Sequence, residues 1–100
     1  MVEELKVVWS KTAQQALEKH YNYIKEDSLK SAKKVKSEIL RITKSLSKVP
    51  TRYPLDKYRK NNKGDIRAFE KYSLRVAYQV KEKEIVIVRV RHIKRSPLEY

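Results

Sequence analysis

The residues best suited to chemistry gather near the end of the chain, in a basic segment that also carries a histidine and a tyrosine. In chain order they are Arg89, Arg91, His92, Lys94, Arg95 and Tyr100. Cleavage within RNA needs a group that takes the 2′-hydroxyl proton, cations that stabilise the extra phosphate charge, and a donor to the leaving oxygen. Arginine and lysine supply the charge, while histidine or tyrosine transfers protons or stacks on a base. The segment therefore suits metal-independent phosphodiester chemistry, although a solvated strand end has the same composition.

Alternation along a strand limits how these side chains can cooperate. Period-two alternation places Arg89 and Arg91 on one side of the strand, and His92 on the other side with Val88 and Val90. The side chains therefore cannot all converge on one point. The two sides of the strand therefore form either two separate subsites, or one functional group and one solvated face.

Several other chemistries lack the residues they need. His20 and His92 are the only histidines and cysteine is absent, so a nitrogen and sulfur metal site and a thiol nucleophile are excluded. His20 falls on an apolar helical face, which is typical of a packed histidine. Gly64 is the only glycine, so no glycine-rich phosphate loop exists. We therefore expect no metal and no cofactor.

The charge of the chain indicates the kind of partner. Lysine and arginine number 25 against 12 aspartates and glutamates, a formal net charge of +13. Such a charge attracts phosphate backbones and accelerates association with anionic partners. RNA, DNA, the ribosome, an anionic membrane and an acidic protein all fit this charge. The amino-terminal residues lack a secretory pattern and no long apolar run occurs, so we expect a cytoplasmic protein.

Two helices are expected after a first strand over residues 5–9. The first runs to about residue 26, capped by Ser10 or by Thr12 with Gln15. The second starts after Asp27 or Ser28. Its apolar seam, at alternating steps of three and four, comprises Ala32, Val35, Ile39, Ile42, Leu46 and Val49. The short connection predicts an antiparallel helical hairpin, and the seam suits packing within the chain better than a membrane surface.

Pro50 and Pro54 end the second helix, and residues 50–64 form a polar connection to the next strand. Such a long loop in a small domain is usually functional or ordered by a partner. The candidates for RNA binding in this segment, together with Arg89 and Arg91 on the last strand, are Lys57, Arg59, Lys60 and Lys63. Strands are expected over 66–72, 74–80 and 85 to about 93, and the unbroken apolar run 85–88 predicts a central strand. The 100 residues thus predict one α+β domain, an antiparallel-rich sheet of order β-α-α-β-β-β packed on the hairpin.

The carboxyl half resembles the RelE/ParE toxins of bacterial toxin-antitoxin systems. The resemblance is carried by the strand 74–80, a short charged turn, the strand 85–92, Lys94-Arg95 and the late Tyr100. The amino half also fits, with Ala16-Leu17 and Tyr23-Ile24 on the first helix, so the resemblance covers almost the entire chain. It implies the RelE-like fold and an acidic cognate antitoxin as partner.

The resemblance also implies roles for single residues. Arg75 matches the phosphate-contacting arginine of the RNA-cleaving members, and Arg67 a basic position on the preceding strand. Lys94 or Arg95 matches the basic residue after the last strand, Tyr100 the terminal tyrosine, and His92 a histidine of some members. Phe69 departs from the pattern, because the nucleases carry a second lysine there. Arg75 also has a structural alternative, an ion pair across the sheet with Glu70 or Glu99.

Three functions follow from these observations. The first is a ribosome-dependent mRNA endoribonuclease, in which Arg75 and Arg67 hold the phosphate, Lys94 or Arg95 neutralises charge, and His92 or Tyr100 transfers protons or stacks. The second is a ParE-type protein that poisons DNA gyrase and is not an enzyme, favoured by the helical hairpin and Phe69. The third is a non-catalytic RNA- or ribosome-binding protein. The basic cluster and the resemblance together favour the first.

Overall fold

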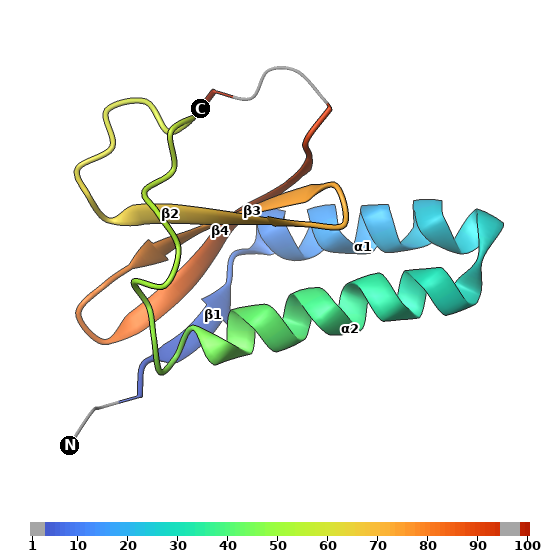
Figure 1. The fold of residues 1–100 in the computed structure, drawn as a ribbon, viewed down its shortest axis with the longest axis horizontal. Coiled ribbons are helices and arrows are strands. Elements are labelled where there is room, and N and C mark those ends of the chain that lie inside the picture. Colours follow the sequence, from blue (N-terminus) through green and yellow to red (C-terminus); the bar gives the residue numbers. More distant parts are fainter. Residues whose placement is uncertain (1–3, 95–98) are drawn as a thin grey trace.

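The computed structural model describes residues 4–94 and 99–100, which form a mixed sheet with two helices packed on one face (Figure 1). The elements in chain order are β1 (Lys6–Trp9), α1 (Lys11–Asp27), α2 (Leu29–Ser45), β2 (Ile66–Lys71), β3 (Leu74–Val80) and β4 (Glu84–His92). The sheet order is β1-β4-β3-β2. β1 runs parallel to β4, and the other pairs are antiparallel. The predicted element order and the central position of the last strand are confirmed.

The two helices begin at serine caps. The Ser10 side chain accepts a hydrogen bond from the Ala13 amide and the Ser28 side chain one from the Ser31 amide, each at 3.1 Å. These caps satisfy amides that lack a partner in the first helical turn. The helices then lie side by side as the expected hairpin (Figure 1). Along the described chain, neither helix is long and apolar enough to cross a membrane.

The second helix is shorter than its apolar seam predicted. It ends at Ser45, and residues beyond Leu46 turn away from the helical axis. Leu46 is fully buried, but Val49 is 41% exposed. The extension of the seam to Val49 was therefore wrong, because a spacing of three residues continues a helical face only while the backbone remains helical.

The main core fills the space between the helices and the sheet. It joins both helices to all three carboxyl-terminal strands, and its fully buried members include Ile39, Leu46, Leu74, Val76, Tyr78, Ile85 and Ile87. The Tyr78 hydroxyl donates a hydrogen bond of 2.8 Å to the Pro50 carbonyl, which satisfies the only polar atom of that side chain. The apolar alternation of β3 thus faces the helices, as its sequence predicted.

A β-bulge changes the alternation of β4. The register of β3 with β4 shifts between Ala77 and Tyr78, which pair with Arg89 and Ile87. Val88 is therefore the additional residue, and it packs with Ala77 on the face away from the helices. The expectation that Val88 shares a face with Val90 was wrong, whereas Val90 belongs to the main core.

The turn between β2 and β3 has only two residues. Lys71 pairs with Leu74, and the intervening Tyr72 and Ser73 have φ values of 51° and 65°. Two consecutive left-handed residues are typical of the tight turn that matches the twist of a hairpin. The turn fixes the register of β2 and β3, and this register places Arg75 opposite Glu70.

Candidate functional site

The face of the sheet away from the helices is covered by the loop 50–64 and by Tyr100. Short side chains at Ala68 and Ala77 leave space on this face, and the partly buried Tyr100 packs against them. Two backbone hydrogen bonds join Tyr100 to the loop, from its amide to Tyr58 O at 3.0 Å and from the Lys60 amide to Tyr100 O at 2.7 Å. Residues distant in sequence therefore meet over the second face of the sheet.

A buried carboxylate, Asp56, lies at the centre of this cover. It is 2% exposed. Its Oδ1 accepts hydrogen bonds from Arg75 Nη2 at 2.8 Å and from the Tyr58 amide at 3.1 Å. Its Oδ2 accepts one from the Tyr100 hydroxyl at 2.6 Å. A guanidinium, a phenol and a main-chain amide from three separate segments thus converge on one carboxylate.

The protonation states follow from these contacts. Burial opposes ionisation of Asp56, but the hydrogen bonds from Tyr100, Arg75 and the Tyr58 amide together outweigh it and hold the pKa of this carboxyl below its usual value. Burial, together with the hydrogen bond to Asp56, raises the pKa of the Tyr100 hydroxyl. The Tyr100 hydroxyl therefore keeps its proton and serves as a hydrogen-bond donor to Asp56.

Arg75 is held by two carboxylates. Its side chain is 12% exposed, with Nη2 on Asp56 and Nη1 on Glu70, each at 2.8 Å. The guanidinium also lies over the Tyr58 ring, 4.7 Å from the centroid. The ion pair with Glu70, the structural alternative for Arg75, is present. Asp56 was not among the site residues predicted from the sequence, although it is the only acidic residue in the basic loop 50–64.

The other arginines near this site contact its aromatic ring. The guanidiniums of Arg89 and Arg59 lie 4.1 and 5.1 Å from the Tyr100 ring centroid. Burial, followed by repulsion from Arg91, lowers the pKa of Arg89. Arg91 is opposite Arg75 in the register and Arg89 is opposite Ala77. The two β4 arginines therefore share one side of the strand, as predicted, and this side is the face that carries Arg75. Positive charge therefore concentrates around Tyr100.

The remaining predicted residues lie apart from this cluster. The Arg67 Nη1 donates to the Tyr53 carbonyl at 2.6 Å, and Phe69 packs its ring on Tyr53 in the main core. His92 lies on the helix side, where its ring centroid is 6.3 Å from that of His20. Lys94 is exposed, and Arg95 lies outside the described residues. Arg75 and Tyr100 are brought together, whereas Arg67 and His92 are not joined to them by a direct contact.

The loop 50–64 is ordered by its own hydrogen bonds. The Asn62 side chain donates to Ile66 O at 2.8 Å and accepts from the Gly64 amide at 2.9 Å, where Gly64 has a φ of 93°. Segment 54–56 pairs with β2, through Asp56 N to Ile66 O at 2.9 Å and Ala68 N to Pro54 O at 3.2 Å. Lys57, Arg59, Lys60 and Lys63 are exposed along the loop. These contacts connect the loop to itself and to β2.

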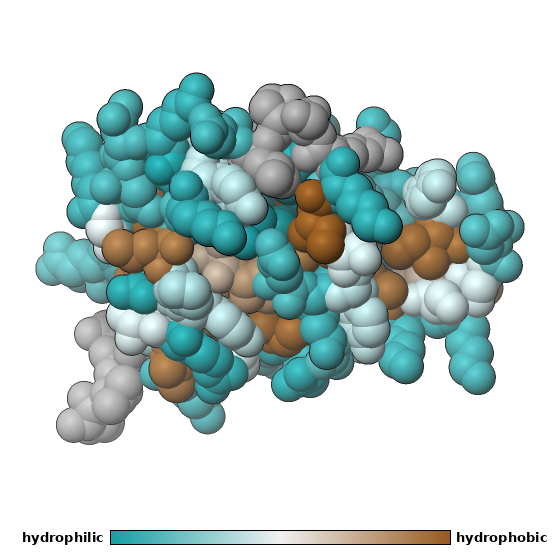
Figure 2. Space-filling view, turned by 45° about the horizontal axis from the view of Figure 1, so that its top comes forward, coloured by the Kyte–Doolittle hydropathy of each residue, from teal (hydrophilic) through white to brown (hydrophobic). Residues whose placement is uncertain are grey.

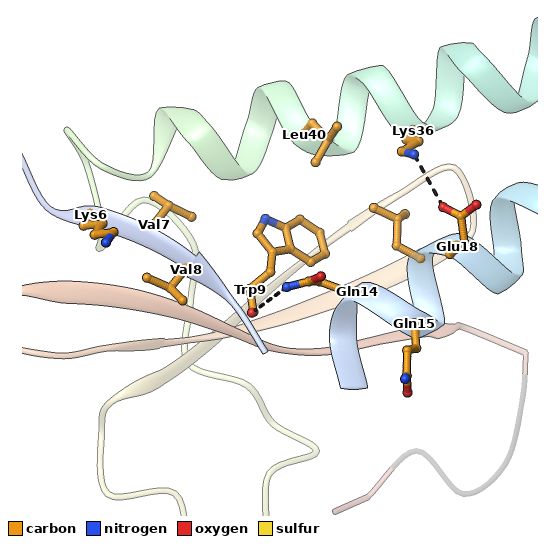
Figure 3. A pocket seen from close by; sticks show the side chains of 10 residues that line it. Lys6, Val7, Val8, Trp9, Gln14, Gln15, Glu18, Lys36 and Leu40 are labelled. Carbon is orange, nitrogen blue, oxygen red and sulfur yellow. Dashed lines mark hydrogen bonds and ion pairs between the residues drawn. The ribbon is translucent and has the colours of Figure 1, made fainter. Parts of the chain in front are cut away.

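A groove lies on the opposite side of the molecule, between β1 and the helices (Figure 3). It has a volume of about 720 Å³ and is lined mainly by the β1 residues, Leu17 and Leu40. The Gln14 side chain donates to the Trp9 carbonyl at 3.0 Å, and Lys36 pairs with Glu18 at 3.5 Å across the groove. The groove thus combines an apolar floor with a charged rim.

Comparison with known proteins identifies the family. No curated protein matches the sequence significantly. Among solved structures, the chain is similar to one from the chromosomal ParDE toxin-antitoxin system of P. aeruginosa, with a TM-score of 0.71, 22% identity, and 92% and 99% of the two chains covered. It is also similar to one from the RelBE2 toxin-antitoxin complex of Mycobacterium tuberculosis, with a TM-score of 0.66, 18% identity, and coverage of 92% and 94%. The YoeB dimer of Staphylococcus aureus gives a TM-score of 0.58, 20% identity, and coverage of 89% and 97%.

These structural similarities confirm the RelE/ParE-like α+β fold. The model of the ParE toxin of the type II toxin-antitoxin system parDE matches residues 7–97, which is nearly the whole described chain. The chain therefore belongs to the ParE toxin family of type II toxin-antitoxin systems.

Proposed function

We propose that this toxin binds and poisons DNA gyrase without cutting nucleic acid itself. The observation that carries the proposal is the engagement of Arg75 and Tyr100 by Asp56. These are two residues that an mRNA endoribonuclease would use to hold phosphate and to transfer protons. The proposal reverses the preference drawn from the sequence, and the match to the ParE family supports it.

The cost of releasing the two residues favours this function. For Arg75 to bind a substrate phosphate, its guanidinium has to leave two carboxylates at 2.8 Å. Asp56, 2% exposed, would then lose its cationic partner inside the protein. Leaving a buried charge unpaired costs several kcal/mol, about 3–5 in measured cases. A binding protein that acts through its surface does not incur this cost.

The test measures both activities with one protein preparation. The toxin should block supercoiling by purified gyrase and trap gyrase on broken DNA, while primer extension finds mRNA intact on translating ribosomes. The partly buried Arg67 and His92 serve as probes. Arg67→Ala and His92→Gln should leave growth arrest unchanged, as should the control Lys81→Ala in an exposed turn. Cut transcripts with normal supercoiling would reject the proposal.

A ribonuclease remains the second candidate, because positive charge persists beside the site. Arg89 and Arg59 contact the Tyr100 ring, and Arg91 lies on the same face. A metal-independent cut using these cations with His92 or Lys94 would need the ribosome to rearrange the site. Binding to RNA or the ribosome without chemistry needs only the exposed lysines of the loop. Primer extension separates cleavage from both non-cutting functions.

We also propose an acidic antitoxin as partner, bound along β1. No described strand pairs with the outer edge of β1, whereas segment 54–56 covers the edge of β2. An extended peptide can add to such an edge and place side chains in the adjacent groove. Figure 2 shows one face of the molecule, covered mostly by hydrophilic side chains with hydrophobic residues in separate patches. Because the chain has a formal net charge of +13, we expect binding of an acidic partner to depend strongly on charge.

The partner proposal is tested by reversing charge in the groove. Lys6→Glu and Lys36→Glu should weaken binding of the neighbouring acidic gene product at low salt, measured by gel filtration and calorimetry. Lys83→Glu, exposed on the turn between β3 and β4, changes the net charge equally and serves as the control. Equal weakening by all three variants would place the contact elsewhere.

A further inference from the structure

A basic groove lies where the end of α2 meets the segment before β1 (Figure 1). It has a volume of about 580 Å³. Among the described residues, its charged lining consists of four cations and one carboxylate: Arg41, Lys44, Lys48, Arg52 and Glu4. The formal charge of this lining is therefore +3, whereas the groove beside β1 has Lys6 and Lys36 against Glu18. The groove at the end of α2 thus suits an anionic ligand.

Main-chain hydrogen bonds hold the backbone that carries these cations. The Leu5 amide donates to Ser47 O at 3.1 Å, which joins the segment before β1 to the turn after α2. The Arg52 amide donates to Val49 O at 3.2 Å and closes the next turn. The Arg52 side chain lies toward the helix end, where its Nη1 donates to Ser45 Oγ at 3.3 Å. The walls of the groove are therefore set by the fold, and only the long side chains need to adjust to a ligand.

Most of the charge in this groove is not neutralised within the protein. Arg41 has a carboxylate partner within α2, but its side chain is still 67% exposed. Lys48 pairs with Glu4 at 3.8 Å and is 73% exposed. Over residues 4–94 and 99–100, Lys44 and Arg52 form no ion pair. Lys44 complements the dipole of the last helical turn, but Lys48 and Arg52 lie beyond the helix, where this effect does not require a cation.

We propose that this groove binds the phosphate backbone of duplex DNA, namely the DNA that gyrase holds while the toxin poisons it. The identity of this DNA rests on the proposed function, whereas the groove rests on its own geometry. Separate, exposed cations neutralise phosphates without reading base sequence. The described lining contains no aromatic ring on which a base of a single strand would stack, so a duplex is favoured over a single strand.

The test neutralises the two cations beyond the helix. Lys48→Gln with Arg52→Gln removes two charges from the groove. Lys81→Gln with Lys83→Gln, in the exposed turn between β3 and β4, lowers the net charge equally and is the matched control. Fluorescence anisotropy with a short labelled DNA duplex measures the Kd over a series of salt concentrations. Duplex RNA and single-stranded DNA of the same length are titrated in parallel.

The salt dependence of binding counts the phosphate contacts. Each lost contact should lower the slope of log Kd against log salt concentration by about 0.9, so the groove double variant should lose about 1.8. The control double variant should keep the wild-type slope, because its lysines lie outside the groove. Equal slopes for the two double variants would overturn the proposal. Tighter wild-type binding to duplex RNA or to single-stranded DNA than to duplex DNA would also overturn it.

Gyrase poisoning separates this inference from the function on which it rests. The groove double variant should stay folded by circular dichroism, because exposed substitutions cost little stability, and should trap less gyrase on broken DNA than the control. Weaker DNA binding with unchanged trapping would overturn the inference and leave the gyrase proposal intact. No trapping by the wild type would reject the gyrase proposal, whereas the difference in slope would still assign duplex binding to the groove.

Discussion

The two faces of the sheet are covered in different ways. On one face, two helices bury large aliphatic side chains such as Ile39, Leu46 and Ile87. On the other, a loop and one tyrosine cover alanines, and a buried carboxylate joins the cover to the sheet. The first cover depends on apolar area and is insensitive to charge. The second cover depends on a few hydrogen bonds, each of which needs both of its partners. A single substitution should therefore lower the stability of the protein more on this face than on the helix-covered face.

The largest expected effect is that of Asp56→Ala. Removing the carboxylate leaves Arg75 and Tyr100 without their shared acceptor, and breaking a buried ion pair costs about 3–5 kcal/mol. Chemical denaturation measures the change in the free energy of unfolding. Glu82→Ala, an exposed carboxylate in the turn after β3, is the control and should change stability by less than about 0.5 kcal/mol. A small loss for Asp56→Ala would show that the second face does not depend on the carboxylate.

The contribution of Asp56 should also depend on pH. Its pKa is held below the usual value in the folded chain, so the ionised carboxyl stabilises the fold above its unfolded-state pKa. This stabilisation is lost as the pH falls through the folded-state pKa. The stability difference between wild type and Asp56→Asn should therefore be greatest near neutral pH and shrink in acid. Thermal melts at a series of pH values would show this, and a constant difference would contradict it.

Tyr100→Phe should have an intermediate effect. The ring that packs on Ala68 and Ala77 is retained, but Asp56 Oδ2 loses its donor at 2.6 Å. A buried acceptor left without a partner costs about 1–3 kcal/mol. Denaturation should place this variant between Asp56→Ala and wild type. Tyr21→Phe, on the helical hairpin, is the control for loss of a hydroxyl.

The smallest effect is expected on the helix-covered face. Ile87→Val removes one buried methylene and should cost about 0.5–1.5 kcal/mol. The loss of stability should be the same at neutral and acidic pH, because the substitution removes no contact with an ionisable group. Melts beside the Asp56→Asn series provide the measurement. If Ile87→Val destabilised the protein more than Asp56→Ala, the contrast between the two faces would be reversed.

The difference between the faces also explains what could be predicted from sequence. The helices and strands that form the main core carry apolar residues at regular spacing, and serines mark the helical starts. The cover of the second face has no such period: Asp56 meets Arg75 and Tyr100 only after the sheet has formed. The bulge that turns Val88 to this face depends on the pairing of β3 with β4. Arg75 and its cross-strand partner Glu70 could therefore be named from the sequence, but not the contact of Arg75 with Asp56.

The parallel pairing of β1 with β4 sets when the chain can complete its fold during synthesis. Lys6 pairs with Glu84 and Trp9 with Ile87, so the earliest strand has no partner until the latest strand has left the ribosome. The helical hairpin emerges from the ribosome before β2, β3 and β4, so its apolar side is exposed until the sheet forms. Such long-range pairing slows folding, because the entropy cost of closing a long loop comes before the stabilising contacts between β1 and β4 can form. The folded domain should therefore form only after β4 has left the ribosome, when the apolar side of the hairpin can pack on the completed sheet.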